Sequence, residues 1–454
     1  MGSEWTTIGK VAQVFDGPHA TPKKITEGPY FLSISSLIGG QLDLSKSARI
    51  SEEQFEKWTR RVTPQQGDIL FSYETRLGDA ALMPSGIKAC LGRRMGLLRP
   101  DTNKVDPSYL LFAYLGPEFQ REIKTRTISG ATVDRIALKE LPFFPIRIPP
   151  LKEQKRISGV LRALDKKITL NQEINITLES MAQALFKSWF VDFDPVIDNA
   201  LAAGNPIPEA LQSRADARAA LGDRRKPLPD HIRQQFPDRF VLTDEMGWVP
   251  EGWQVTPLSE AIEINPKVTI KKGQKAKHVD MKALPTSGYC VGEISEKEYA
   301  GGAKFERGDV LLARITPCLE NGKTGVVDFL SFGDPGFGST EFIVMRPKNA
   351  IGTPFVAALA RQEAFRQHCI SNMVGSSGRQ RVQNSCFDNY FICTPKMPDI
   401  LDLYRNNCEA WFEKMTALAN ESRSLGLLRD TLLPKLLSGE LRIPEVEKQV
   451  EEAI

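Results

Sequence analysis

Apolar residues recur every three or four positions along two long stretches of the chain, and this spacing predicts two long helices. In residues 149–190 the repeating apolar positions are Ile157, Leu161, Leu164, Ile168, Ile174, Leu178, Met181 and Leu185. In residues 397–440 they are Trp411, Phe412, Met415, Leu418, Leu425, Leu428 and Leu432. A helix of about 38 residues is roughly 57 Å long, which exceeds most globular helices, so each stretch is predicted to pack against a partner helix.

The first stretch carries signals for its start and its register. Pro149 and Pro150 favour a helix start, because proline lacks an amide hydrogen that the first turn would leave unpaired anyway. A polar break from Asn171 to Asn175 divides the apolar stripe, and a buried asparagine in a helical seam usually fixes register. Since the second stretch has the same apolar spacing, we expect the two helices to pair with each other.

The globular sequence before the first helix recurs before the second. The stretch Gly67–Phe71, a turn feeding an apolar strand, is matched by Gly308–Leu312, and Trp5 is matched by Trp253. Helical patterns at Tyr109–Arg121 and Phe355–Phe365 also correspond. The offsets between matched positions stay between 241 and 248, which indicates an internal repeat of one globular domain plus one long helix.

The predicted fold class is therefore α+β, with two similar mixed α/β domains separated by a pair of long antiparallel helices in a pseudo-twofold internal repeat. The Pro-rich connector is predicted to hold one short helix near Glu209–Leu221. The expected segments are a first domain (1–148), a long helix (149–190), a connector (191–250), a second domain (251–396), a second long helix (397–440) and a tail (441–454).

Composition and charge exclude several classes of protein. Hydrophobic residues make up 41% of the chain, no run of 18 apolar residues occurs, and seven scattered cysteines form no C-x-x-C pair. We therefore expect a cytoplasmic protein without a membrane span. The net charge is only +3, so any contact with nucleic acid is expected to be local.

Motifs for catalysis are incomplete in this sequence. Gly322-Lys323-Thr324 resembles the end of a phosphate-binding loop, but Pro317 stands where its first glycine belongs. The four histidines are far apart and lack metal-ligand spacing. We therefore expect no catalytic residue, no metal and no bound cofactor in this chain.

Cationic residues and one aromatic residue in loops are the candidate DNA-binding residues, because arginine can bridge the two major-groove acceptors of guanine and lysine mainly holds phosphates. The alternative for each of them is a solvated loop side chain without a ligand. The candidates are Arg60, Arg61, Tyr73, Arg76, Arg93, Arg94, Arg126 and Arg135 in the first domain, and Lys267, Lys271, Lys272, Lys275, Lys277, Arg314, Arg379 and Arg381 in the second.

Four ordered stretches resemble the specificity subunit of type I restriction-modification systems. They are Pro149–Ile157, Leu185–Pro195, Gly247–Trp253 and Leu432–Leu441. The resemblance implies two target-recognition domains that each read half of a bipartite site in double-stranded DNA, with the helical pair setting the spacer. It also implies two docked modification (methyltransferase) subunits, with restriction subunits in the full complex. S-adenosylmethionine, ATP and Mg²⁺ are then expected only in those partner subunits.

The same resemblance suggests residues that would bind partner subunits: Glu153, Gln154, Ile157, Leu185, Trp189, Phe190, Leu432 and Leu436. The second repeat has Pro395–Ile400 where the first has its Glu-Gln signature, which favours the first docking surface. Two other functions stay open. One is a helical protein-binding scaffold without sequence-specific DNA recognition. The other is a free-standing methyltransferase, against which the missing Asn-Pro-Pro-aromatic motif argues.

Overall fold

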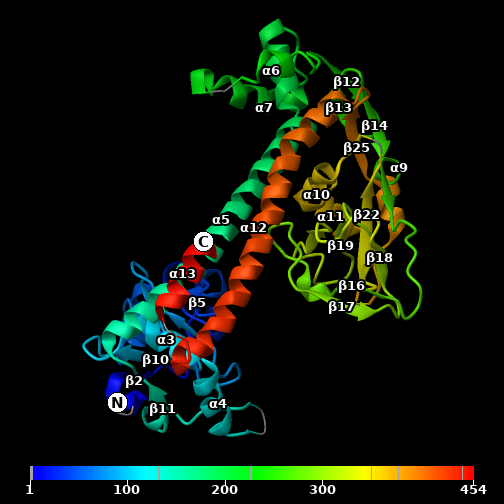
Figure 1. Cartoon of the computed structure of the whole chain (residues 1–454). Helices are drawn as coiled ribbons and strands as arrows, with labels where there is room; N and C mark the ends of the chain where they lie inside the picture. Colours follow the sequence, from blue (N-terminus) through cyan, green and yellow to red (C-terminus); the bar gives the residue numbers. More distant parts are fainter. Residues whose placement is uncertain are drawn as a thin grey trace. The chain divides into compact units, whose positions relative to one another are not determined.

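The computed structural model describes residues 4–130, 133–224, 227–348, 350–376, 378–441 and 443–453. The chain divides into two compact units: unit 1 is Met1–Thr169 with Ser422–Ile454, and unit 2 is Leu170–Glu421. Two helices of 40 residues each, α5 (Leu151–Phe190) and α12 (Asp399–Ser438), contribute residues to both units (Figure 1). The predicted pair of long helices is thus confirmed.

Contacts inside each unit show that α5 and α12 run antiparallel. In unit 1, Asp165 of α5 forms an ion pair with Arg429 of α12 at 2.7 Å. In unit 2, residue numbers rise along α5 as they fall along α12, through the pairs Asn171–Glu421, Asn175–Met415 and Ala182–Tyr404. Asn171 is buried in this seam, as the polar break in the sequence predicted, and donates to the Glu421 carboxylate at 2.8 Å.

Unit 1 is built on a four-stranded sheet with the order β2-β10-β7-β8, and α3 and α4 follow its strand β10 in the chain. The strands of this sheet are β2 (Ala12–Asp16), β10 (Met95–Pro100), β7 (Ile69–Ser72) and β8 (Ala80–Leu82). Smaller sheets are β6-β3-β9 (Ala48–Arg49, Ile25–Phe31, Ala89–Cys90), β1-β11 (Trp5–Thr7, Pro145–Arg147) and β4-β5 (Leu37–Ile38, Gln41–Leu42). The helices are α1 (Ile8–Val11), α2 (Glu52–Trp58), α3 (Pro107–Leu115), α4 (Pro117–Thr125) and α13 (Ile443–Ala453).

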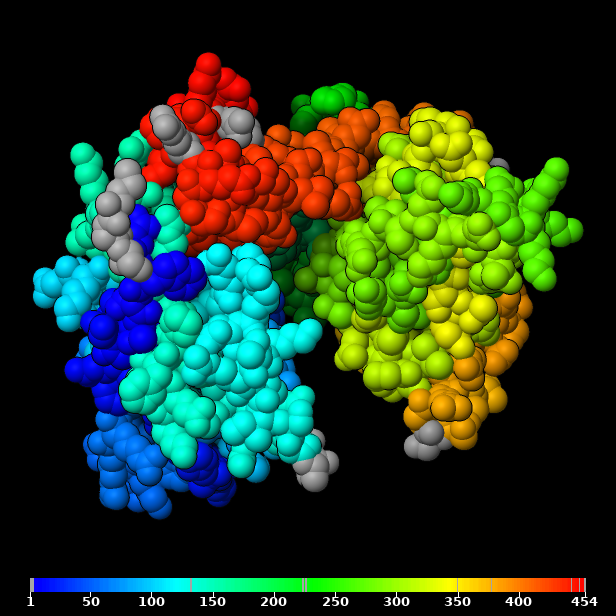
Figure 2. Space-filling model, turned by 60° about the horizontal axis from the view of Figure 1, so that its bottom comes forward, coloured from blue at the N-terminus to red at the C-terminus, as the bar shows by residue number. Residues whose placement is uncertain are grey.

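The end of α12 and the helix α13 complete the core of unit 1. Leu432, Leu436 and Val446 are buried in one cluster with Ile157 and Leu161 of α5. In Figure 2 the red surface of this last segment lies directly against the cyan surface of residues from the α3–α4 region. The C-terminal residues therefore close the fold of unit 1.

Unit 2 repeats this topology. Its four-stranded sheet has the order β15-β22-β19-β20, with β15 (Ile262–Ile264), β22 (Phe342–Pro347), β19 (Val310–Ala313) and β20 (Thr324–Val326). The second sheet is β17-β16-β21-β18 (Ile294–Glu298, Lys275–Val279, Gly336–Gly338, Ala303–Phe305). The remaining pairs are β14-β25 (Trp253–Pro257, Phe391–Pro395) and β23-β24 (Met373–Val374, Arg381–Val382), and the helices are α9 (Leu258–Ala261), α10 (Thr353–Arg361) and α11 (Glu363–Ser371). The predicted internal repeat is confirmed in its topology.

The repeated Gly-Asp-strand motif has the same role in both units. Gly67 and Gly308 adopt positive φ angles of 88° and 91°, which lets the chain turn into β7 and β19. The following Asp68 is buried and receives two hydrogen bonds from Arg99, at 2.7 and 3.0 Å. Asp309 receives two from Arg346, at 2.7 and 2.8 Å. In each unit, the aspartate before one central strand is therefore hydrogen-bonded to an arginine near the end of the neighbouring strand.

Two details differ from the sequence patterns. The predicted helix Tyr109–Arg121 is divided, because Pro117 starts α4 and leaves Gly116 extended between α3 and α4. The connector is more regular than its proline content predicted. Besides α7 (Glu209–Ala219) it forms α6 (Asp194–Ala203), α8 (Asp230–Arg233) and the hairpin β12-β13 (Phe240–Thr243, Gly247–Pro250).

Candidate nucleic-acid interface

Three chain segments meet at one end of the inner strands β7 and β10 of the central sheet in unit 1, and they bring several predicted arginines together. Backbone hydrogen bonds join Tyr73 to Arg94 at 3.2 Å and Ile136 to Tyr73 at 2.9 Å. Arg135 precedes Ile136 in the chain, and its backbone forms an antiparallel β-bridge with the backbone of Glu74. We call Tyr73, Arg76, Arg94 and Arg135 the first loop cluster, since all four side chains start from these joined segments.

The equivalent segments meet in unit 2. The amide of Arg314 donates to the carbonyl of Glu341 at 3.0 Å, and the amide of Val382 donates to the carbonyl of Arg314 at 2.9 Å. We call Arg314, Glu341, Arg379 and Arg381 the second loop cluster. The structure thus gathers all three arginines predicted for the second domain, together with a carboxylate that the sequence analysis did not select.

In each cluster a carboxylate holds one arginine side chain in place. Arg94 Nε lies 3.2 Å from Glu74 Oε2, and Arg94 Nη1 donates to Thr75 Oγ1 at 3.0 Å. Arg381 makes three contacts with the Glu341 carboxylate, at 2.7, 2.9 and 3.0 Å. These hydrogen bonds from Arg381 outweigh the effect of burial and lower the pKa of Glu341, so the pair is charged at neutral pH.

Tyr73 is the least accessible of the predicted DNA-binding residues in unit 1. Its side chain is only 4% exposed and belongs to the core of unit 1, where burial raises its pKa. Its role as a direct DNA contact stays a prediction, and its burial does not favour stacking on a base. Its backbone remains a part of the first loop cluster.

The other predicted residues of unit 1 lie outside the first loop cluster or at its margin. Arg60 and Arg61 are exposed and line a pocket of about 460 Å³ beyond the end of α2, where Arg61 lies 3.7 Å from Asp16. Arg93 is exposed beside Arg94. Arg126 caps the end of α4 and stacks over the ring of Phe144, 4.8 Å from its centroid. Of these residues, only Arg93 adjoins the cluster in sequence.

The predicted lysines of unit 2 belong to a different sheet. Lys267, Lys271 and Lys272 lie in the loop before β16, and Lys275 and Lys277 lie on β16 itself. All five are exposed, and Lys277 lies 3.8 Å from Glu296 on the neighbouring strand β17. At the second loop cluster β19 ends just before Arg314 and β22 begins just after Glu341, so the lysines on the other sheet form a separate basic surface.

Most residues predicted to bind partner subunits are buried within this chain. Their role in partner binding stays a prediction, although at most 5% of each is exposed in this chain: Gln154, Ile157, Trp189, Phe190, Leu432 and Leu436. Gln154 shows the reason for its burial: its amide donates to Pro149 O at 2.7 Å and Lys104 O at 3.1 Å, and its oxygen accepts from the Asp106 amide at 2.8 Å. Glu153 and Leu185 are half-buried and stay candidates.

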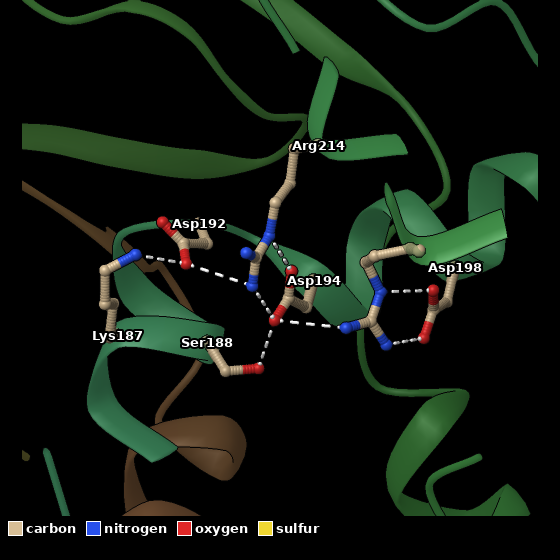
Figure 3. A network of polar contacts seen from close by, with 7 residues as sticks. Lys187, Ser188, Asp192, Asp194, Asp198 and Arg214 are labelled. Atoms are coloured by element: carbon tan, nitrogen blue, oxygen red, sulfur yellow. Dashed lines mark hydrogen bonds and ion pairs between the residues drawn. The ribbon is translucent and has the colours of Figure 1, made fainter. Parts of the chain in front are cut away.

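A network of ion pairs fastens the connector to the end of α5 (Figure 3). Asp194 of α6 accepts hydrogen bonds from Ser188 of α5 at 2.8 Å and from Arg214 of α7 at 2.7 and 2.8 Å. Burial opposes the charge on Asp194, but these bonds and the nearby Arg218 outweigh it and lower the pKa of Asp194. The network is structural, and sequence patterns did not reveal it because its partners come from three separate helices.

Comparisons with known proteins agree with this architecture. Residues 3–180 match the family model described as the type I restriction modification DNA specificity domain. The type I restriction enzyme HindI specificity subunit of Haemophilus influenzae is 26% identical over 405 residues, which are 83% of this chain and 87% of that protein. The chain is therefore similar to type I restriction-modification specificity subunits over most of its length.

Another similar protein is the EcoAI specificity subunit of Escherichia coli, 30% identical over 205 residues. Those residues are 43% of this chain and 33% of the relative. A solved structure, the type I restriction-modification S subunit from M. genitalium, aligns over 96% of both chains with a TM-score of 0.50 and 16% identity. That likeness shows a shared fold. Among the described residues, none of the helices combines the length and the apolar character of a membrane span.

Proposed function

We propose that this chain is the specificity subunit of a type I restriction-modification complex and that each of its units reads one half of a bipartite site in double-stranded DNA. The observation that carries the proposal is the duplicated loop cluster, in which arginines start from the same backbone framework in both units. Arginine is the side chain that most often contacts guanine in the major groove. The basic surface around Lys267–Lys277 would hold phosphates, since lysine neutralises backbone charge without reading sequence.

Catalysis is assigned to partner subunits. We propose that two modification subunits supply S-adenosylmethionine chemistry, and that restriction subunits supply ATP- and Mg²⁺-dependent cleavage in the full complex. This chain would provide specificity alone. Its contribution to activity is then the choice of site.

The docking surface for the modification subunits is proposed on the exposed side of α5. Lys152, Lys155, Arg162 and Lys166 are exposed and recur at helical spacing, beside the half-buried Glu153. These side chains are available to a partner, unlike the buried signature residues. Leu185 would extend the same role toward the other end of the helix.

The helical pair is proposed to set the spacer between the half-sites, because α5 and α12 both contain residues of unit 1 and unit 2. A matched insertion tests this role: four residues in α5 at the Thr169–Leu170 boundary and four in α12 at the Glu421–Ser422 boundary. Four helical residues add about 6 Å and about 40° of rotation. Since one base pair adds about 3.4 Å and roughly 35°, the spacer should lengthen by one or two base pairs while both half-sites stay the same.

The proposed function is tested by mapping methylated adenines in host DNA with the gene present or deleted. We expect one bipartite motif that disappears on deletion. A motif that persists without the gene, or methylation without sequence dependence, would reject DNA specificity and favour the helical scaffold. An unchanged spacer in the insertion variant would reject only the spacing role.

A further inference from the structure

The two loop clusters share a backbone framework residue by residue. In unit 1 the hydrogen bonds run from Tyr73 N to Arg94 O, from Ile136 N to Tyr73 O and from Thr75 N to Asp134 O. In unit 2 they run from Arg314 N to Glu341 O, from Val382 N to Arg314 O and from Thr316 N to Gln380 O. The strand registers agree, because Ser72 pairs with Met95 and Ala313 pairs with Phe342. Arg94 and Glu341 therefore occupy the same position in their units.

Side chains of opposite charge stand at this matched position. Arg94 offers only hydrogen-bond donors, whereas an ionised Glu341 offers only acceptors. The position matched to Arg135 is Arg381, which keeps the positive charge. The two units thus differ at position 94/341 in the chemistry that a base edge could recognise.

Both side chains are held by partners and keep free bonding capacity. Arg94 uses Nε toward Glu74 and Nη1 toward Thr75, and no described residue accepts a hydrogen bond from its Nη2. Glu341 receives two contacts from Arg381 on Oε1 and one on Oε2. A carboxylate has roughly four acceptor sites, so Oε2 can accept a further bond. Both side chains are partly exposed, at 30% for Arg94 and 24% for Glu341.

A carboxylate at the matched position argues against a role in holding phosphates. Phosphate oxygens repel Glu341, whereas the amino group at N4 of cytosine donates to glutamate in the major groove. The equivalent arginine suits the two acceptors of guanine. Two different half-sites require different hydrogen-bonding groups at equivalent positions. The matched position provides them, with the donor Arg94 in unit 1 and the acceptor Glu341 in unit 2.

We propose that residues 94 and 341 are specificity-determining positions, with Arg94 reading guanine in one half-site and Glu341 reading cytosine N4 in the other. Glu74 and Arg381 are positioning residues that hold these two side chains. The inference rests on the proposed function and deepens it, since it names the chemistry read at one position of each half-site.

The test uses the full chain assembled with its modification partner and a DNA library randomised at each half-site in turn. Glu341→Gln should reduce the preference at one base pair of one half-site roughly 5- to 150-fold, the range for losing one good side-chain contact to a base. The other half-site should keep its preferences. Arg94→Gln should reduce the preference at one base pair of the half-site read by unit 1 and leave the half-site read by unit 2 unchanged.

Matched controls neutralise exposed charges away from the clusters. Glu293→Gln removes the partner of Lys282 in unit 2, and Lys88→Gln removes the partner of Glu52 in unit 1. Both control variants should keep the wild-type motif. Arg94→Lys keeps the charge but lacks the rigid planar fork of arginine, so it should keep a phosphate contact and weaken the preference for guanine.

The possible outcomes separate this inference from the proposed function. If wild-type complex shows no sequence preference, the proposed function fails. If the wild-type motif is clear but both Gln variants retain it, or lose activity equally on all sequences, the inference alone fails. An equal loss of affinity on all sequences in Arg94→Gln that Arg94→Lys restores would identify a phosphate contact and overturn the reading of guanine by Arg94.

Discussion

Removing either partner of the buried Glu179–Arg361 ion pair should destabilise unit 2 far more than removing an exposed charge from the same helix. Glu179 lies on α5 and Arg361 ends α10, and their side chains are only 7% and 5% exposed. Arg361 Nε lies 3.3 Å from Glu179 Oε1. The Arg361 guanidinium also donates to the carbonyls of Pro285, Thr286, Gly288, Gly322 and Thr324. The pair therefore joins α5, α10 and two loops of unit 2.

The expected cost follows from burial. Burial lowers the pKa of Arg361, but arginine stays charged at neutral pH, so Glu179→Leu leaves an uncompensated cation inside unit 2. Breaking a buried pair in this way costs about 3–5 kcal/mol. For a unit of this size that corresponds to a fall in Tm of roughly 6–20 °C. Arg361→Leu should cost a similar amount, because it strands Glu179 and the carbonyls.

Hydrogen exchange measured by mass spectrometry on the full chain reads this effect locally. Peptides from α10 and α11 should lose protection in both single variants, while peptides from α3 and α4 in unit 1 serve as the internal reference. The exposed Glu173→Gln on α5 should change stability by less than about 0.5 kcal/mol. The double variant should cost less than the sum of the singles by about 0.5–3 kcal/mol. Single variants indistinguishable from Glu173→Gln, or additive costs, would refute the coupling.

Three further changes test other parts of the fold by urea unfolding. Gln154→Ala should lower the free energy of unfolding by about 1–3 kcal/mol, because it leaves the Asp106 amide and two carbonyls without their hydrogen-bond partner. The exposed Lys155→Ala should be nearly neutral. Equal effects of the two variants would contradict a stabilising role of the three Gln154 hydrogen bonds. Asp194→Asn should destabilise the chain at pH 7 relative to the exposed control Asp230→Asn. The folded-state pKa of Asp194 lies below its ordinary value of 3.8, so its contribution is present above about pH 4 and is lost as the pH falls through the lowered value. The gap in stability between the two variants should therefore narrow as the pH falls below about 4, and a constant gap would argue against the charge. Gly159→Ala, on an open helix surface, should stabilise the chain by about 0.5–1 kcal/mol, while Gly92→Ala should destabilise it, because a Cβ there would lie 1.8 Å from the Leu32 carbonyl oxygen; the opposite order would be incompatible with the packing described.

Periodic features of the sequence were sufficient to predict the main architecture. The apolar spacing in α5 and α12 is set by one helical face, and the buried Asn171 stands where the polar break predicted it. The matched Gly67 and Gly308 turns were predictable because positive φ and a following buried strand leave a short local signature. The apolar spacing, the polar break and the glycine turns are all local in the sequence, which is why they could be predicted.

Features that depend on distant partners were not predictable in the same way. Gln154 has a conspicuous place in the sequence, but its burial depends on the loop before α3, about 50 residues away. Tyr73 follows a central strand and packs inward, so a loop position did not imply exposure. Glu341 was not selected because only cations and aromatic residues were considered as readers. Aligning the repeats at the strand β22 would have placed Glu341 opposite Arg94.

The central claim is that two equivalent readers in one chain each determine half of the site. The most direct measurement is the methylated motif of a chain in which residues 251–396 are replaced by residues 1–148, assembled with the same modification partner. Because DNA-site symmetry mirrors protein symmetry, we expect an inverted repeat of the half-site that unit 1 reads, with the original spacer. A methylated motif that keeps the second half-site, or one that shows no inverted symmetry, would contradict it.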